Sequence, residues 1–215
     1  MRLQLGREQV VRYCRKLAAS SLASGTSGNV SVFDRAAGLM AISPSSMDYD
    51  DMLAADVVLM DLDGNVLESE RRPSTEWGMH LACYRARADI NAVVHTHSPA
   101  ATTLAVLGQE LPAVHYMIAL SGSATVPLAP YHLYGTELLA EAAVAALQGG
   151  SACLLESHGV LAVGGDLHQA WSTAEQIEFC ADLYLRAQSI GEPKILSDQQ
   201  ITEVIAQLES YKRQQ

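Results

Sequence analysis

The segment from Ile90 to His97 constrains the fold of this chain more than any other. It is short, apolar and rich in β-branched residues, and these properties predict a buried strand. Alternate side chains of a strand point to the same face of a sheet, so the imidazoles of His95 and His97 should converge. A third histidine, His158, follows a second apolar run at residues 151–156. Three neutral nitrogen ligands leave one coordination position open, which is typical of catalytic rather than structural zinc sites.

Helical and strand patterns follow one another irregularly along the rest of the chain. The predicted helices cover residues 7–23, 73–87, 99–107, 137–147 and 167–190, with a last helix after a capping box at 197–200. The predicted strands cover residues 30–33, 39–42, 56–61, 65–67, 90–97, 124–128, 151–156 and 159–163. Because strict βαβ order is missing, we expect an α/β fold whose sheet is largely antiparallel or mixed. No repeat or long linker divides the chain, so we expect one domain over residues 1–215.

Composition excludes several classes of protein. The chain has 215 residues, of which 49% are hydrophobic, and this fraction indicates a globular protein. The net charge of −10 argues against non-specific binding of nucleic acid, which needs a basic surface. No apolar run is long enough to cross a membrane, so we expect no membrane partner. Four cysteines without CxxC spacing are expected to be reduced, which favours the cytoplasm.

The segment Arg72–Trp77 is a second candidate for chemistry. Ser74 and Thr75 are predicted at the start of a helix, where hydroxyls, free N–H groups and the helix dipole favour a phosphate. Ordinary helix capping would explain the same residues. Glu76 is predicted in the first turn, where the dipole alone favours a carboxylate. If that turn faces the metal, Glu76 becomes a candidate general base.

Two further loops are rich in hydroxyl groups. Residues 25–31 combine glycines, hydroxyls and the Asn29 amide, and residues 43–46 include Ser45 and Ser46. Such loops can bind anions, although a simple turn explains each one alone. The tyrosines Tyr116 and Tyr211 are possible proton donors, but nothing in the sequence alone separates them from other tyrosines. The remaining histidines (His80, His115, His132 and His168) lack this context and are expected to be structural.

Several short motifs together resemble a known family. They are GTSGNVS at 25–31, STEW at 74–77, VVHTH at 93–97, VHYMI at 114–118, APY at 129–131 and SHG at 157–159. Their order and spacing resemble the class II sugar-phosphate aldolases of the aldolase/adducin family over about residues 5 to 211. The resemblance implies a three-layer α/β/α fold with a largely antiparallel sheet, Zn2+ as cofactor, and a homotetramer with active sites between subunits.

The resemblance also implies a role for individual residues. His95, His97 and His158 match the zinc ligands, and Glu76 matches an acid/base that also occupies the metal when substrate is absent. The matching phosphate-binding residues are Gly28, Asn29, Ser45, Ser46, Ser74 and Thr75. Tyr116 matches a proton donor that reaches a neighbouring subunit's site, and Tyr211 matches a second tyrosine on the C-terminal segment. The implied phosphorylated sugar substrate is a ketose 1-phosphate, with L-fuculose 1-phosphate expected first. Its cleavage to dihydroxyacetone phosphate and L-lactaldehyde belongs to fucose degradation.

Departures from the family pattern leave alternatives open. Ser45-Ser46 replaces the usual Thr-Gly, so Ser46 would be strained if this position needs a positive φ. Alternative activities are aldol cleavage of another ketose 1-phosphate, such as a 5-deoxyribulose derivative, and methylthioribulose-1-phosphate dehydration. A catalytically silent adducin-like interaction domain and a structural zinc protein are alternatives of another class. The lysines Lys16, Lys194 and Lys212 lie outside the candidate loops, so no Schiff-base mechanism is expected.

Overall fold

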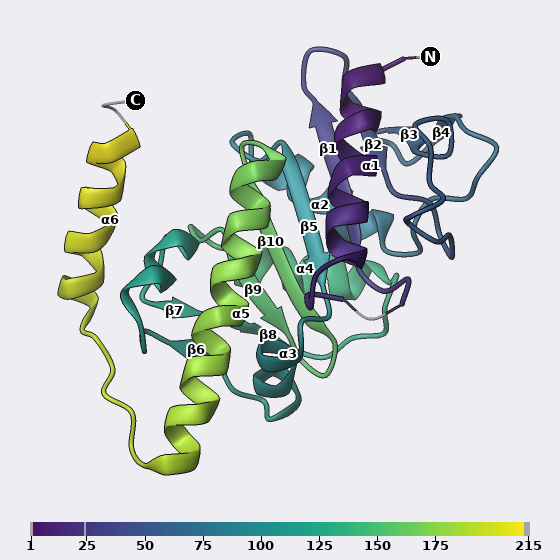
Figure 1. The fold of residues 1–215 in the computed structure, drawn as a ribbon. Coiled ribbons are helices and arrows are strands. Elements are labelled where there is room, and N and C mark those ends of the chain that lie inside the picture. Colours follow the sequence, from purple (N-terminus) through teal and green to yellow (C-terminus); the bar gives the residue numbers. More distant parts are fainter. Residues whose placement is uncertain (1, 24, 213–215) are drawn as a thin grey trace.

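The computed structural model describes residues 2–23 and 25–212 and is built around one large sheet (Figure 1). The eight strands lie in the order β4 (Val66–Glu68), β3 (Val58–Asp61), β2 (Leu39–Ile42), β1 (Asn29–Asp34), β5 (Ala92–Thr96), β10 (Gly159–Gly164), β9 (Ala152–Leu155) and β8 (Leu128–Ala129). Neighbouring strands are antiparallel, except that β8 is parallel to β9. A small second sheet pairs β6 (Leu111–Pro112) with β7 (Thr125–Val126).

Helices cover both faces of the large sheet. One hydrophobic core contains α1 (Gln4–Ala18), α3 (Pro99–Val106) and α5 (Leu167–Ile190), and the other contains α2 (Trp77–Ala86) and α4 (Glu137–Ala146). Figure 1 shows α1 and α5 in front of the sheet, with α2 and α4 behind it. The predicted three-layer α/β/α fold with a largely antiparallel sheet is therefore confirmed.

Strand β5 lies near the middle of the sheet, and its alternating side chains reach both cores. Ala92 and Val94 pack with α1 and α5, whereas Val93 packs with α2 and α4. Alternation continues to His95, which therefore lies on the α2 face. This face of the sheet carries the candidate site.

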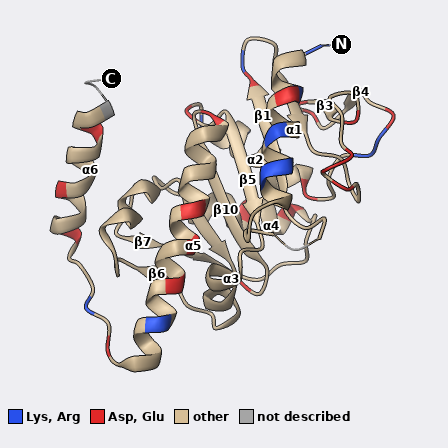
Figure 2. Ribbon diagram, viewed as in Figure 1, with Lys and Arg blue, Asp and Glu red and all other residues tan. Residues whose placement is uncertain are grey.

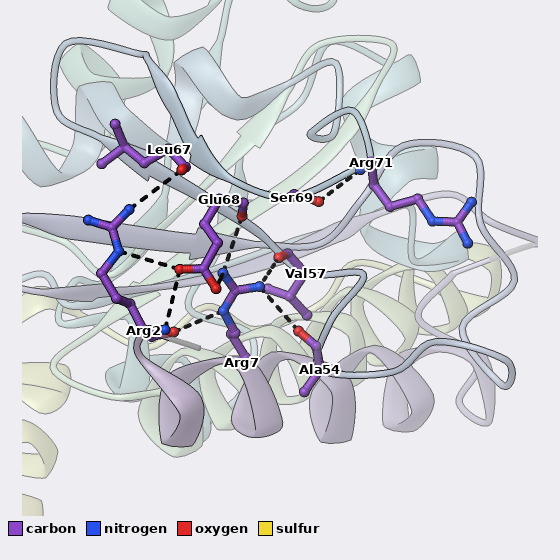
Figure 3. Close-up of polar contacts among 8 residues, drawn as sticks. All are labelled: Arg2, Arg7, Ala54, Val57, Leu67, Glu68, Ser69 and Arg71. Atoms are coloured by element: carbon purple, nitrogen blue, oxygen red, sulfur yellow. Dashed lines mark hydrogen bonds and ion pairs between the residues drawn. The ribbon is translucent and has the colours of Figure 1, made fainter.

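A buried arginine fastens the first helix to the edge of the sheet. Arg7 in α1 is 1% exposed and donates hydrogen bonds to the carbonyls of Arg2, Ala54, Val57 and Glu68 (Figure 3). Its guanidinium also lies 3.3 Å from the Glu68 carboxylate. Buried charge is tolerated here because each donor has an acceptor.

Basic and acidic residues lie mainly on different helices. Figure 2 shows basic residues gathered on α1 and acidic residues on α5 and on α6 (Asp198–Lys212). The ion pair between Lys16 and Glu175, at 3.5 Å, joins α1 to α5. No helix in the described part of the chain is long and apolar enough to span a membrane.

Some predicted boundaries are wrong, and nonlocal contacts explain why. Helix α2 begins at Trp77 instead of residue 73, because Pro73 forms a bridge with Pro44 and extends the backbone before the helix. The predicted strand 124–128 is two strands, β7 and β8, which belong to different sheets on either side of Pro127. The first helix covers residues 4–18 instead of 7–23.

Candidate metal centre and phosphate pocket

Three histidines and one glutamate converge at the end of the central strands. His95 is on β5, His97 follows it, His158 lies in the turn between β9 and β10, and Glu76 is the N-cap residue of α2. One ligand atom from each of these four side chains lies within 4.8 Å of the others. The Nε2 atoms of His95 and His97 are 2.9 Å apart. Glu76 lies 3.2 Å from Nε2 of His95 and 3.2 Å from Nε2 of His158.

Local backbone features place these histidines. A Cβ atom on Gly159 would collide with the Thr96 carbonyl oxygen, so only glycine allows β10 to pack this closely beside β5. Ser157, directly before His158, has a φ of 54° and makes the tight turn that turns the chain back. Gly28, with a φ of 79°, likewise lies against the His95 carbonyl oxygen. These contacts give a structural reason for the SHG motif and for the glycine before Asn29.

The electrostatics of the four side chains suit a bound cation. The His95 Nδ1 atom lies 2.9 Å from the Val160 carbonyl; donation there leaves Nε2 as the lone-pair nitrogen. Burial raises the pKa of Glu76, but His95 and His158 outweigh it and hold that pKa well below its usual range. Burial lowers the pKa of His95, but the Glu76 carboxylate outweighs burial and raises it. Burial, then His95 and His158, lowers the pKa of His97 to about 4.

The side chains fit a divalent metal ion. Oε1 of Glu76 is buried and makes no hydrogen bond of good geometry among the described residues, although Nε2 of His158 lies 3.2 Å away; buried carboxylate oxygens normally have such a bond. Two imidazole lone pairs facing each other at 2.9 Å repel unless a proton or cation lies between them. Neutral imidazoles with one carboxylate are ligands that Zn2+ accepts. This set of residues could therefore hold a metal ion.

A cavity of about 400 Å³ opens beside the four side chains. Hydrogen bonds join two of its three hydroxyl-rich segments: Ser74 N–H donates to the Ser43 carbonyl at 3.0 Å, and Ser45 N–H donates to the Arg72 carbonyl at 2.9 Å. Of the predicted residues, Gly28, Asn29, Ser45, Ser46, Ser74, Thr75, Glu76, His97 and His158 line it. Ser46 has a φ of 56°, so the positive φ considered from the sequence is present. No lysine or arginine is among the described residues that line the cavity.

Other predicted residues lie elsewhere, and some lining residues were missed. Tyr116 in η1 (Tyr116–Ser121) and Tyr211 in α6 are 50% and 56% exposed, and neither lines the cavity of its own chain. Tyr131, His132 and Tyr134 do line it. They belong to an irregular loop without periodicity, for which the APY motif ending at Tyr131 was the available signal, and His132, expected to be structural, lines the cavity instead.

Asn29 was expected to bind phosphate, but its side chain contacts Glu76 and His80. Its amide nitrogen donates to Oε2 of Glu76 at 2.9 Å, and its carbonyl oxygen lies 2.5 Å from Nε2 of His80. His80 was expected to be structural. Its spacing of four residues from Glu76 on one helix face was the available signal.

Residues 8–185 match the family model described as the class II aldolase and adducin N-terminal domain. The chain belongs to the class II aldolase and adducin family. The 5-deoxy-D-ribulose 1-phosphate aldolase of Bacillus thuringiensis serovar kurstaki is 48% identical over 214 residues, which is 100% of each chain. The L-fuculose phosphate aldolase of Escherichia coli (strain K12) is 37% identical over 94% of each chain.

A solved L-fuculose 1-phosphate aldolase has the same fold, with a TM-score of 0.92 and 43% identity over 95% of this chain and 96% of that one. The family, the relatives and the fold are those of class II aldolases, so the chain is a class II aldolase, an enzyme of the carbon–carbon lyase type.

Proposed function

We propose that this class II aldolase reversibly cleaves a deoxyketose 1-phosphate to dihydroxyacetone phosphate and a short aldehyde. The observation that carries the proposal is the group of three histidines and Glu76 at the edge of a cavity lined by serine and threonine hydroxyls. The hydroxyl-lined part of the cavity suits the phosphate of such a substrate. The histidines and Glu76 suit the carbon atoms that carry the carbonyl group.

His95, His97, His158 and Glu76 would hold a Zn2+ ion. When bound, the ion supplies a Lewis acid that stabilises the negative charge of the enediolate left by cleavage between C3 and C4. Glu76, which would occupy the metal only when substrate is absent, moves the proton at C3 of dihydroxyacetone phosphate once substrate is bound. Ser45, Ser46, Ser74 and Thr75, with Gly28 and Asn29 beside them, bind the phosphate and orient the reacting carbon atoms.

The aldehyde half of the substrate separates two candidates. L-fuculose 1-phosphate would give L-lactaldehyde, and 5-deoxyribulose 1-phosphate would give acetaldehyde. The 48% identity to a 5-deoxy-D-ribulose 1-phosphate aldolase favours the second, and the likeness to fuculose aldolases supports the first. Measuring kcat/KM on both compounds, with a non-phosphorylated ketose as control, tests the proposal. Release of dihydroxyacetone phosphate from neither phosphate would overturn it.

A proton-exchange measurement tests the role of Glu76. In zinc-loaded Glu76→Gln protein, exchange of the C3 proton of dihydroxyacetone phosphate should fall by about 10²–10⁴, the range for loss of a positioned general base. Zinc content, followed by metal analysis, should stay high, because three histidines remain as ligands. Thr173→Val, which removes a buried hydroxyl on the opposite face of the sheet, is the control. Exchange within a few-fold of wild type would remove Glu76 from the mechanism.

We also propose a homotetramer in which the active sites lie between subunits, and a location in the cytoplasm. Tyr116 and Tyr211 are exposed and lie outside the cavity of their own chain, which supports their acting as proton donors in a neighbouring one. In that role Tyr116 exchanges a proton with the aldehyde oxygen. The four cysteines are free and buried, as expected where disulfides do not form.

Subunit mixing tests the shared site. Glu76→Gln and Tyr116→Phe proteins should each be nearly inactive, but mixed oligomers should regain activity in about one site in four on random mixing in a closed ring. The regained activity reflects sites that take intact Glu76 from one subunit and intact Tyr116 from the next. If the mixture is no more active than its parents after subunit exchange, the two residues act within one chain.

A further inference from the structure

A continuous line of buried polar side chains runs away from Glu76 between β1 and α2. Glu76, His80 and Tyr84 are spaced four residues apart and lie on one face of the helix. Asn29 and Ser31 are spaced two apart and lie on the facing side of the strand. All five are at most 6% exposed. An apolar contact would pack these two elements more simply, so the polar line calls for a reason.

The contacts in this line form one chain of hydrogen bonds. From Glu76, the chain passes to the Asn29 amide at 2.9 Å and then to Nε2 of His80 at 2.5 Å. It continues from Nδ1 of His80 to the Ser31 hydroxyl at 2.6 Å and ends at the Tyr84 hydroxyl, also at 2.6 Å. Each polar side chain therefore has a partner, and the chain has one end at the reacting centre.

The carboxylate at one end determines the direction of every bond. An ionised carboxylate only accepts, so Asn29 must present its NH₂ group to Glu76 and its carbonyl oxygen to His80. That oxygen also only accepts, so Nε2 of His80 must carry a hydrogen. Burial, with a smaller effect from His95, lowers the pKa of His80 to about 3, so the ring is neutral and Nδ1 accepts from Ser31. The Ser31 oxygen is then left to accept from Tyr84.

If the hydrogen bonds ran in the opposite direction, the carbonyl oxygen of Asn29 would lie beside Glu76. The two ends of an asparagine amide are nearly identical in shape, so packing alone does not choose between them. A His80 ring with its hydrogen on Nδ1 would favour the flipped amide and point the Asn29 oxygen at the carboxylate. Two acceptors would then face each other in a buried site, which is costly.

We propose that His80 is a positioning residue: through Asn29 it fixes the orientation of the Glu76 carboxylate that moves the C3 proton. This rests on the proposed function of Glu76. His80 does not line the cavity, so it touches neither substrate nor metal and acts only through Asn29. Asn29 then serves the reacting carboxylate through its side chain, beside any contact that it makes with phosphate.

Neutron diffraction tests the directional chain without any activity measurement. In crystals of the wild-type protein exchanged into D₂O, a single deuterium should be seen on Nε2 of His80, with the deuterated NH₂ of Asn29 facing Glu76. A deuterium on Nδ1 of His80, or on both nitrogens, would overturn the proposal. The result does not depend on which ketose phosphate is the substrate, so it stands apart from the test of the proposed function.

Two substitutions at one position separate positioning from support of the fold. In His80→Gln, the amide nitrogen can take the place of Nε2 and still donate to Asn29. In His80→Asn, the shorter amide reaches the place of Nδ1, keeps the contact with Ser31 and loses the contact with Asn29. We expect kcat to fall about 10–100-fold in His80→Asn and less than about fivefold in His80→Gln, since small misplacements of a reacting group have effects of this size. KM and zinc content should stay within about twofold in both.

Two more variants keep the test decisive if His80→Asn folds poorly. Ser31→Ala removes the hydroxyl that holds the His80 tautomer, and its kcat should fall between the values of the two His80 variants. Thr173→Val removes a buried hydroxyl on the opposite face of the sheet and should leave kcat unchanged. Equal kcat values in the two His80 variants, or losses that follow zinc content or melting temperature across all four proteins, would overturn the proposal.

Discussion

Ser46 shows how a single residue adapts to this pocket. Its φ of 56° lies in the left-handed region, which costs a residue with a side chain about 1–2 kcal/mol. The strained residue lies in the loop that contains Ser45 and Ser46, both of which line the cavity proposed to bind phosphate. Strained backbone of this kind persists at binding sites because surrounding contacts hold it.

Substitution of Ser46 separates the backbone from the hydroxyl. Ser46→Gly removes the strain but adds flexibility to the unfolded chain, so the free energy of unfolding should rise by up to about 1 kcal/mol. If the backbone N–H binds phosphate, KM for the ketose 1-phosphate should stay within about threefold in both Ser46→Gly and Ser46→Ala. Ser74→Ala is the comparison, with KM expected to rise about tenfold on loss of a charge-assisted bond. A tenfold rise in Ser46→Gly would instead assign the contact to the Ser46 hydroxyl.

At the scale of elements, local patterns predict what local forces decide. Helix α5 covers residues 167–190 as predicted, because its apolar period is long and Asp166 caps its first turn. The capping box at Ser197 and Gln200 is also present. The predicted start of α2 was wrong because the bridge between Pro44 and Pro73 joins segments that are far apart in sequence.

The candidate site divides in the same way. The sequence predicts the convergence of His95 and His97, because side chains two residues apart in a strand point to the same face. The pairing of Asn29 with His80 depends on how β1 docks against α2, and no local pattern contains that information. Polar spacing of four on the helix and two on the strand is visible in the sequence, but only the fold shows that the two faces meet.

The side chain of Arg7 holds helix α1 against the edge of the large sheet. In Arg7→Met, four carbonyls lose their donor, but only the bond to Val57 is buried and the other three are part-buried. An unpaired buried group costs about 1–3 kcal/mol and a group that water can reach costs less, so the free energy of unfolding should fall by roughly 2–4 kcal/mol in total. Urea denaturation measures this change. Arg2→Met removes a neighbouring arginine that is 54% exposed and should leave the denaturation midpoint unchanged. Equal effects of the two substitutions would show that Arg7 adds nothing beyond surface charge.

At the scale of the whole molecule, the buried His80 links stability to pH. Burial, and after it His95, lowers the folded pKa of His80 from the ordinary 6.5 to about 3, while the Glu76 carboxylate acts in the opposite direction. Between these two values the unfolded chain binds one more proton than the folded chain. The free energy of unfolding should therefore fall on acidification, by about 1.4 kcal/mol per pH unit from this residue, and should be unaffected by it above pH 6.5.

Urea denaturation of chelated protein at several pH values between 7 and 4 measures this slope. His97, with a pKa of about 4, adds a contribution of the same sign. His80→Gln should reduce the slope by the share of one proton while leaving the contribution of His97 in place. An identical slope in His80→Gln and wild type would mean that His80 takes up a proton in the folded protein.

The absence of lysine and arginine among the described lining residues has a kinetic consequence. A sugar phosphate is an anion, and the chain carries a formal net charge of −10. Diffusional approach is then opposed at long range by the net charge, and capture depends at short range on neutral donors and on the proposed metal ion. Added salt screens that repulsion over about 8–10 Å at physiological ionic strength. The association rate constant of this aldolase and its substrate should therefore rise with ionic strength. Enzymes that attract phosphates with lysine and arginine side chains show the opposite dependence.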